Sequence, residues 1–187
     1  EERGACLDAE EVGVMERFSN KTSIAPTASI SIICGNSSPG IEPYAANSFT
    51  QKTLSGSFTV RNKNLEKILQ EKGFNNEQVW SSISTHEGSV QHLTFLTDHE
   101  KDVFKTAPEI DQHWLIELAA DRTPYISQAQ SLNIFMPGDS SKQYLHDIHF
   151  KAWKKGVKTL YYTRTESVLR GDIAQQAMSE DCLACDG

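Results

Sequence analysis

Apolar residues recur at helical spacing in several segments, which are separated by loops rich in glycine, proline and asparagine. The first such segment predicts an amphipathic helix over Asp8–Phe18. Pro26 disfavours helix in the residue before it, and a short helix is predicted to follow over Ile30–Cys34, closed by Gly35. The chain therefore opens with two helices joined by a turn.

Hydroxyl and β-favouring residues predict a hairpin, with strands over Phe49–Lys52 and Ser57–Val60. Helical spacing resumes after it and predicts four helices: Leu65–Lys72, Glu77–Thr85, His99–Lys105 and Glu109–Ala120. In the last of these, Trp114 and Leu118 lie on one apolar stripe, and we expect Trp80, Trp114 and Trp153 to be core residues.

The chain from residue 131 reads as strand, helix, strand. Ser131–Phe135 and Val157–Tyr162 are the predicted strands, and between them Ser140 or Ser141 caps a helix that ends at Gly156. This order is typical of a parallel α/β unit. Residues 166–187 hold five acidic residues and few large apolar ones, so we expect residues 1–165 to be the folded domain and 166–187 a mobile tail.

Composition narrows the class of protein. The 187 residues are 38% hydrophobic and 23% charged, which suits a globular domain with a core. A net charge of −7 without clustered Lys and Arg argues against a nucleic-acid surface. No apolar run approaches the roughly 18 residues of a membrane span. We expect no nucleic-acid and no membrane partner.

The four cysteines are scattered and do not resemble the framework of a small secreted domain, so we expect a reducing, cytoplasmic location. Cys34 follows two isoleucines and is expected to be buried. The chain starts at Glu1 without an initiator Met, which leads us to expect a piece of a longer protein.

The turn Pro26-Thr27-Ala28-Ser29 is the first candidate site. Backbone N–H groups and two hydroxyls converge where the next helix begins, an arrangement that suits a phosphate or diphosphate. An ordinary helix capped by Ser or Thr is the alternative.

Tyr161 and Tyr162 form the second candidate site. Adjacent phenols can exchange an electron and a proton, but successive side chains of a regular strand point to opposite faces. A redox pair therefore needs a local distortion of the strand. The alternative is a buried strand that happens to carry two aromatic residues.

Cys182 and Cys185 form a C-x-x-C motif near the end of the chain, which can close and reopen a disulfide. A zinc site is the competing interpretation, but zinc requires four ligands, and only His146 and His149 could be recruited. We expect no metal site.

Several segments resemble, in order, the C-terminal part of the large, catalytic subunit of class I ribonucleotide reductases. They are Arg3–Cys6, Ile24–Ser31, Gly40–Pro43, Lys52–Phe58, Gln128–Asn133, Leu160–Tyr162 and the terminal C-x-x-C. The resemblance implies an α/β fold, the last part of that family's ten-stranded α/β barrel, with a flexible C-terminal tail.

The resemblance also implies roles for individual residues. Pro26, Thr27, Ala28, Ser29 and Ile30 would hold the diphosphate of a ribonucleoside diphosphate. Tyr162, on the partner side, and Tyr161, nearer the substrate, would relay a radical from a small, metal-containing subunit.

Cys182 and Cys185 would then reduce the active-site disulfide and be reduced in turn by thioredoxin or glutaredoxin. The activity implied is deoxyribonucleotide biosynthesis by ribonucleoside-diphosphate reductase, which serves DNA replication.

Motifs of the family that lie upstream of Glu1 are not in this sequence, among them the cysteine that carries the thiyl radical. We therefore expect the piece to bind no cofactor of its own and to be inactive without the upstream part and the small subunit. A stand-alone C-x-x-C redox or zinc-binding module and a non-catalytic interaction domain are the alternatives.

Overall fold

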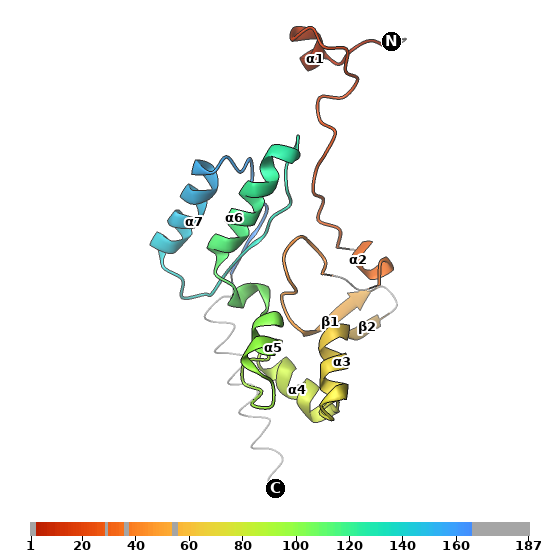
Figure 1. The fold of residues 1–187 in the computed structure, drawn as a ribbon, viewed down its shortest axis with the longest axis vertical. Helices are drawn as coiled ribbons and strands as arrows, with labels where there is room; N and C mark the ends of the chain where they lie inside the picture. Colours follow the sequence, from red (N-terminus) through yellow and green to blue (C-terminus); the bar gives the residue numbers. More distant parts are fainter. Residues whose placement is uncertain (1–2, 29, 36–37, 54–55, 166–187) are drawn as a thin grey trace. The chain divides into compact units, whose positions relative to one another are not determined.

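The computed structural model describes residues 3–28, 30–35, 38–53 and 56–165, which divide into two units (Figure 1). We call residues 30–111 the hairpin unit. Residues 3–28 and 112–165 are the tyrosine unit. The predicted tail, 166–187, lies outside the described residues, so the boundary at residue 165 stays a prediction.

An antiparallel hairpin and several short helices make up the hairpin unit, and Ser48 pairs with Arg61 at the open end of the hairpin. Its elements are α2 (Ile30–Ile33), β1 (Ser48–Thr53), β2 (Gly56–Arg61), α3 (Lys63–Glu71), α4 (Glu77–Thr85), α5 (Asp98–Val103) and the 3-10 turn η1 (Ala107–Glu109). The predicted hairpin and the helices α2 to α5 are confirmed, and α4 has the bounds predicted.

One apolar core stabilises the hairpin unit. It joins α3 and α4 to the loop and helix that follow them, through Leu65, Leu69, Trp80, Ile83, Val90, Leu93, Leu96 and Phe104. Trp80 is only 2% exposed. Burial of this many large apolar side chains is the main stabilising term available to the unit.

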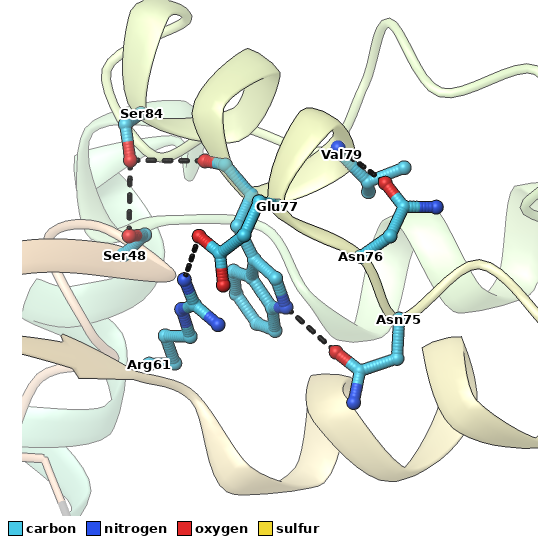
Figure 2. A network of polar contacts seen from close by, with 8 residues as sticks. Ser48, Arg61, Asn75, Asn76, Glu77, Val79 and Ser84 are labelled. Carbon is cyan, nitrogen blue, oxygen red and sulfur yellow. Dashed lines mark hydrogen bonds and ion pairs between the residues drawn. The ribbon is translucent and has the colours of Figure 1, made fainter.

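Polar contacts fix α4 against the hairpin (Figure 2). The Arg61 guanidinium lies over the Trp80 ring at 5.0 Å and pairs with Glu77 at 2.7 Å. The indole N–H of Trp80 donates to Asn75 at 2.8 Å. The indole N–H of the buried Trp80 thus has a hydrogen-bond partner, which offsets the cost of removing this polar group from water.

Asn47 directly precedes β1 and is almost fully buried. Its side-chain amide donates to the carbonyls of Gly88 and Phe104, at 3.0 and 2.8 Å. Its side-chain oxygen accepts from Asn62, the N-cap residue of α3, at 2.9 Å. One side chain therefore joins the start of β1 to the start of α3, the turn after α4 and the end of α5.

The tyrosine unit contains two parallel strands connected by a helix. Its elements are α1 (Leu7–Glu11), α6 (Gln112–Arg122), the 3-10 turn η2 (Thr123–Tyr125), β3 (Ile134–Met136), α7 (Lys142–Lys154) and β4 (Thr163–Thr165). β3 and β4 pair in parallel, so the predicted α/β unit is confirmed, as is the Ser141 cap of α7. The last strand was predicted over Val157–Tyr162, which is wrong: β4 begins only after Tyr162.

Helices α6 and α7 lie side by side (Figure 1). Glu117 of α6 pairs with Lys151 at 2.8 Å and with Lys155 at 2.5 Å, and these two lysines lower the pKa of its carboxyl. The core prediction for Trp114 and Trp153 is wrong, because their side chains are 64% and 72% exposed. Helical spacing finds an apolar stripe but does not show what covers it.

The first predicted helix is also wrong in its extent. α1 ends at Glu11, and Gly13, with φ +70°, turns the chain out of the helix. Val12, Met15 and Phe18, the apolar face of the longer helix predicted, are all exposed. Among the described residues, no helix combines the length and the apolar character needed to cross a bilayer.

Candidate functional site

The candidate site of the tyrosine unit is built around the extended segment that leads into β3. Ile24 donates its N–H to the carbonyl of Ala129 at 3.0 Å, and its own carbonyl accepts from Ser131 at 2.8 Å. These bonds make a parallel bridge between Ile24 and Gln130. The chain that enters the Pro26 turn is therefore fixed to the segment before β3.

The same segment bonds to the tyrosines through its next residues. Tyr161 donates its N–H to the carbonyl of Leu132 at 2.8 Å, and Ile134 donates its N–H to the carbonyl of Tyr162 at 2.8 Å. Because successive residues of an extended chain direct their backbone groups to opposite sides, the tyrosines and Ile24 lie on opposite edges of the segment.

The bonds around the tyrosines depart from a regular parallel ladder. In such a ladder, one residue both donates its N–H and accepts with its own carbonyl. Here Tyr161 donates and Tyr162 accepts, so two residues occupy the place of one. This is a bulge, the local distortion that a side-by-side tyrosine pair requires.

The two phenol rings are in contact. Their centroids are 4.1 Å apart, the ring planes meet at 49°, and the residues are 50% and 52% exposed. Hydrogen bonding to the Tyr162 side chain, followed by electrostatic interaction with that side chain and by burial, raises the pKa of the Tyr161 phenol. If one of two phenols in such contact is oxidised to a phenoxyl radical, it can take a hydrogen atom from the other.

Arg164 also contacts the pair. Its guanidinium carbon lies 5.5 Å from the centroid of the Tyr162 ring, which is a cation–π geometry. The sequence reasoning missed this residue. Its place depends on the pairing of β4 with β3, which the sequence alone does not show.

The Pro26 turn is described only in part. Pro26, Thr27 and Ala28 belong to the tyrosine unit, Ile30 starts α2 in the hairpin unit, and Ser29 lies outside the described residues. Thr27 has φ +53°, a left-handed conformation that is rare for a β-branched residue. Such strained residues cluster at ligand sites, although the phosphate-binding role itself stays a prediction.

The structure describes only some of the cysteines and histidines that the sequence analysis singled out. Cys182 and Cys185 lie outside the described residues. Cys34 is exposed, so its predicted burial is wrong: the four-residue α2 does not cover it. In α7, His149 faces the carbonyl of Leu145 at 2.8 Å, and His146 stacks on Phe150.

The family is decided by a match of residues 8–163 to the model of the ribonucleotide reductase barrel domain. The chain belongs to this family. The predicted family and its α/β barrel fold class are thereby confirmed.

Among its relatives in the family is the ribonucleoside-diphosphate reductase large subunit of Invertebrate iridescent virus 3, to which the chain is 48% identical. That alignment covers 99% of this chain and 31% of the viral protein. The large subunit of Danio rerio is 42% identical over 75% of this chain and 18% of its own length.

A solved structure gives the same result. The class Id ribonucleotide reductase alpha subunit of Actinobacillus ureae superposes with a TM-score of 0.72 at 41% identity, covering 85% of this chain and 28% of that one. The chain thus spans a third or less of these ribonucleotide reductase subunits.

Proposed function

We propose that the chain works as the C-terminal portion of a ribonucleotide reductase large subunit, which reduces ribonucleoside diphosphates to 2′-deoxyribonucleoside diphosphates. Its family, and its 48% identity to a protein named as such a subunit, support the enzyme class. The observation that carries the proposal is the tyrosine pair, whose rings lie 4.1 Å apart because of the bulge.

In the proposed relay, a radical from the metal-containing small subunit oxidises Tyr162 first. The Tyr162 phenoxyl then takes a hydrogen atom from the Tyr161 hydroxyl. The O–H bond of Tyr161 breaks, that of Tyr162 forms again, and the unpaired electron now resides on Tyr161. No net charge moves in this step, so it suits a half-exposed site.

The remaining predicted residues have two further roles in the proposal. The turn Pro26 to Ile30 holds the diphosphate of the substrate. Cys182 and Cys185 re-reduce the active-site disulfide that forms when the 2′-hydroxyl leaves as water, and thioredoxin or glutaredoxin then reduces them. In this proposal the radical cysteine belongs to the upstream part of the large subunit, so the piece is inactive alone. The assembled enzyme works in the cytoplasm.

The test uses the complete large subunit that carries this chain, assembled with its small subunit. Tyr161→Phe should abolish nucleotide reduction, because the deleted hydroxyl is the hydrogen donor of the relay. Tyr125→Phe removes the hydroxyl of a tyrosine that is 80% exposed and outside the pair, and it should leave turnover intact. Normal turnover of Tyr161→Phe would refute the relay and favour a non-catalytic role.

The tail dithiol has a separate test. Joint replacement Cys182→Ser and Cys185→Ser should stop multiple turnovers driven by thioredoxin. It should spare turnovers driven by a small dithiol that reaches the active site directly. Undiminished thioredoxin-driven turnover would exclude the carrier role.

The substrate turn is tested by charge. Ser29→Glu should weaken binding of a ribonucleoside diphosphate through repulsion between like charges, whereas Ser23→Glu, outside the turn, should not. Equal substrate affinities of the two variants would contradict the anion site.

A further inference from the structure

Arg164 occupies a defined place beside the tyrosine pair. It lies in β4, where it is paired in register with Phe135 of β3, and it follows Tyr162 by two residues. Tyr162 belongs to the bulge that precedes β4, and the guanidinium carbon of Arg164 lies 5.5 Å from the Tyr162 ring centroid. The contact therefore follows from the backbone that also forms the bulge.

Among the described residues, no carboxylate forms an ion pair with the exposed Arg164 side chain. Its guanidinium instead contacts the Tyr162 ring. The charge also reaches the second phenol, because Arg164 acts to lower the pKa of Tyr161 against the larger, raising effect of Tyr162.

A cation over an aromatic face interacts with the negative face of the ring. The ring of a neutral phenol is electron-rich, and the ring of a phenoxyl radical is poorer in electrons. The guanidinium therefore stabilises reduced Tyr162 more than oxidised Tyr162. The effect weakens with distance and is smaller at Tyr161, whose ring is not the one that Arg164 covers.

We propose that Arg164 is a positioning residue of the radical relay, which holds the Tyr162 ring and makes Tyr162 the harder of the two phenols to oxidise. The radical that arrives on Tyr162 is then biased to move on to Tyr161. The step is the hydrogen-atom transfer from Tyr161 to the Tyr162 phenoxyl, and Arg164 neither gives nor takes an electron or a proton. This inference rests on the proposed function.

The contact is tested first, without turnover. 3-Fluorotyrosine is placed at position 162 of the complete large subunit, and its ¹⁹F signal is recorded by NMR. Arg164→Gln should move the signal, Arg164→Lys should move it less, and Lys154→Gln should leave it in place. Lys154→Gln removes the same charge from the exposed end of α7. Equal signals in Arg164→Gln and Lys154→Gln would overturn the inference.

The bias is tested in the assembled enzyme. With 3-aminotyrosine at position 162, the radical trapped there during turnover is measured by EPR. Its amount should rise roughly 2–5-fold in Arg164→Gln, the range that an exposed cation–π contact supports. An unchanged amount would overturn the bias even if the ¹⁹F signal moves.

Kinetics separate this inference from the relay itself. With tyrosine at position 162, Arg164→Gln should lower kcat for nucleotide reduction a few-fold and leave KM for the ribonucleoside diphosphate unchanged, with partial rescue in Arg164→Lys. A raised KM with unchanged kcat would overturn the inference. If Tyr162→Phe turns over normally, the relay fails and the bias with it, whereas the ¹⁹F measurement still reports the Arg164 contact.

Discussion

The hairpin unit and the tyrosine unit treat their tryptophans in opposite ways. Trp80 of the hairpin unit is 2% exposed inside a core with polar partners at its edges, whereas Trp114 and Trp153 of the tyrosine unit are more than half exposed. Exposed large apolar side chains that share a region of the surface mark a place where another part of a protein packs.

The difference teaches which part of the chain completes its own core. The hairpin unit encloses eight large apolar side chains, Trp80 among them, in one core, although Ile33, Phe58 and Val103 stay exposed. The tyrosine unit leaves Phe150 and Leu118 exposed together with its two tryptophans. The chain spans 31% or less of the relatives named above, and if it works as part of a large subunit, as proposed, we expect other residues of that subunit to cover these exposed side chains.

The largest expected effect separates the two kinds of tryptophan. Trp80→Ala should destabilise the hairpin unit by about 3–5 kcal/mol, because it leaves a cavity in a closed core. Trp114→Ala should change the stability of this chain by no more than about 0.5 kcal/mol. Urea denaturation measures both, and equal losses would show that the units do not differ in this way.

A second pair of variants tests how tightly the hairpin unit is packed. Gly88 has φ +82°, and a Cβ there would lie 2.3 Å from Cβ of Ala46, so Gly88→Ala should cost about 3 kcal/mol. Gly73 has φ +78° and nothing within 4 Å, so Gly73→Ala should cost only about 1 kcal/mol. Thermal unfolding of both variants gives the comparison, which fails if the costs match.

The smallest expected effect is a pH dependence of the stability of the hairpin unit. His86 and His92 stack there with centroids 3.7 Å apart. Burial, followed by the charges of His86 and Lys101, lowers the pKa of His92 below its usual 6.5. The unfolded chain then binds this proton more readily than the folded one.

Stability from this source is therefore complete above about pH 6.5 and declines as the pH falls from there through the folded pKa of His92. Urea denaturation at successive pH values should show a shallower decline for His92→Gln than for the unmodified chain. Parallel curves would exclude His92 as the origin.

Local signals account for what the sequence predicted correctly. Asn76 caps α4, and the apolar spacing of that helix matches its buried face, so its bounds could be derived from the residues alone. Trp114 could not be placed by the same reasoning, since its exposure depends on what lies against α6 rather than on the helix itself.

The candidate site could likewise be predicted from the sequence only in part. The sequence identified Tyr161 and Tyr162 and the need for a distortion, but the alternation of side chains along a strand does not show where a bulge forms. It formed where Leu132 and Ile134 bond to two different tyrosines, a consequence of pairing between distant segments. Arg164 was missed for the same reason, because its place depends on that pairing.

The hydrogen bonds of Asn47 imply that the segments of the hairpin unit unfold together. Its buried amide bonds to carbonyls after α4 and at the end of α5, and to the cap of α3, so none of these segments can detach without leaving a polar group unpaired. Backbone amides in all of these segments should consequently exchange with deuterium through one shared opening, with one common free energy of opening, rather than by fraying separately.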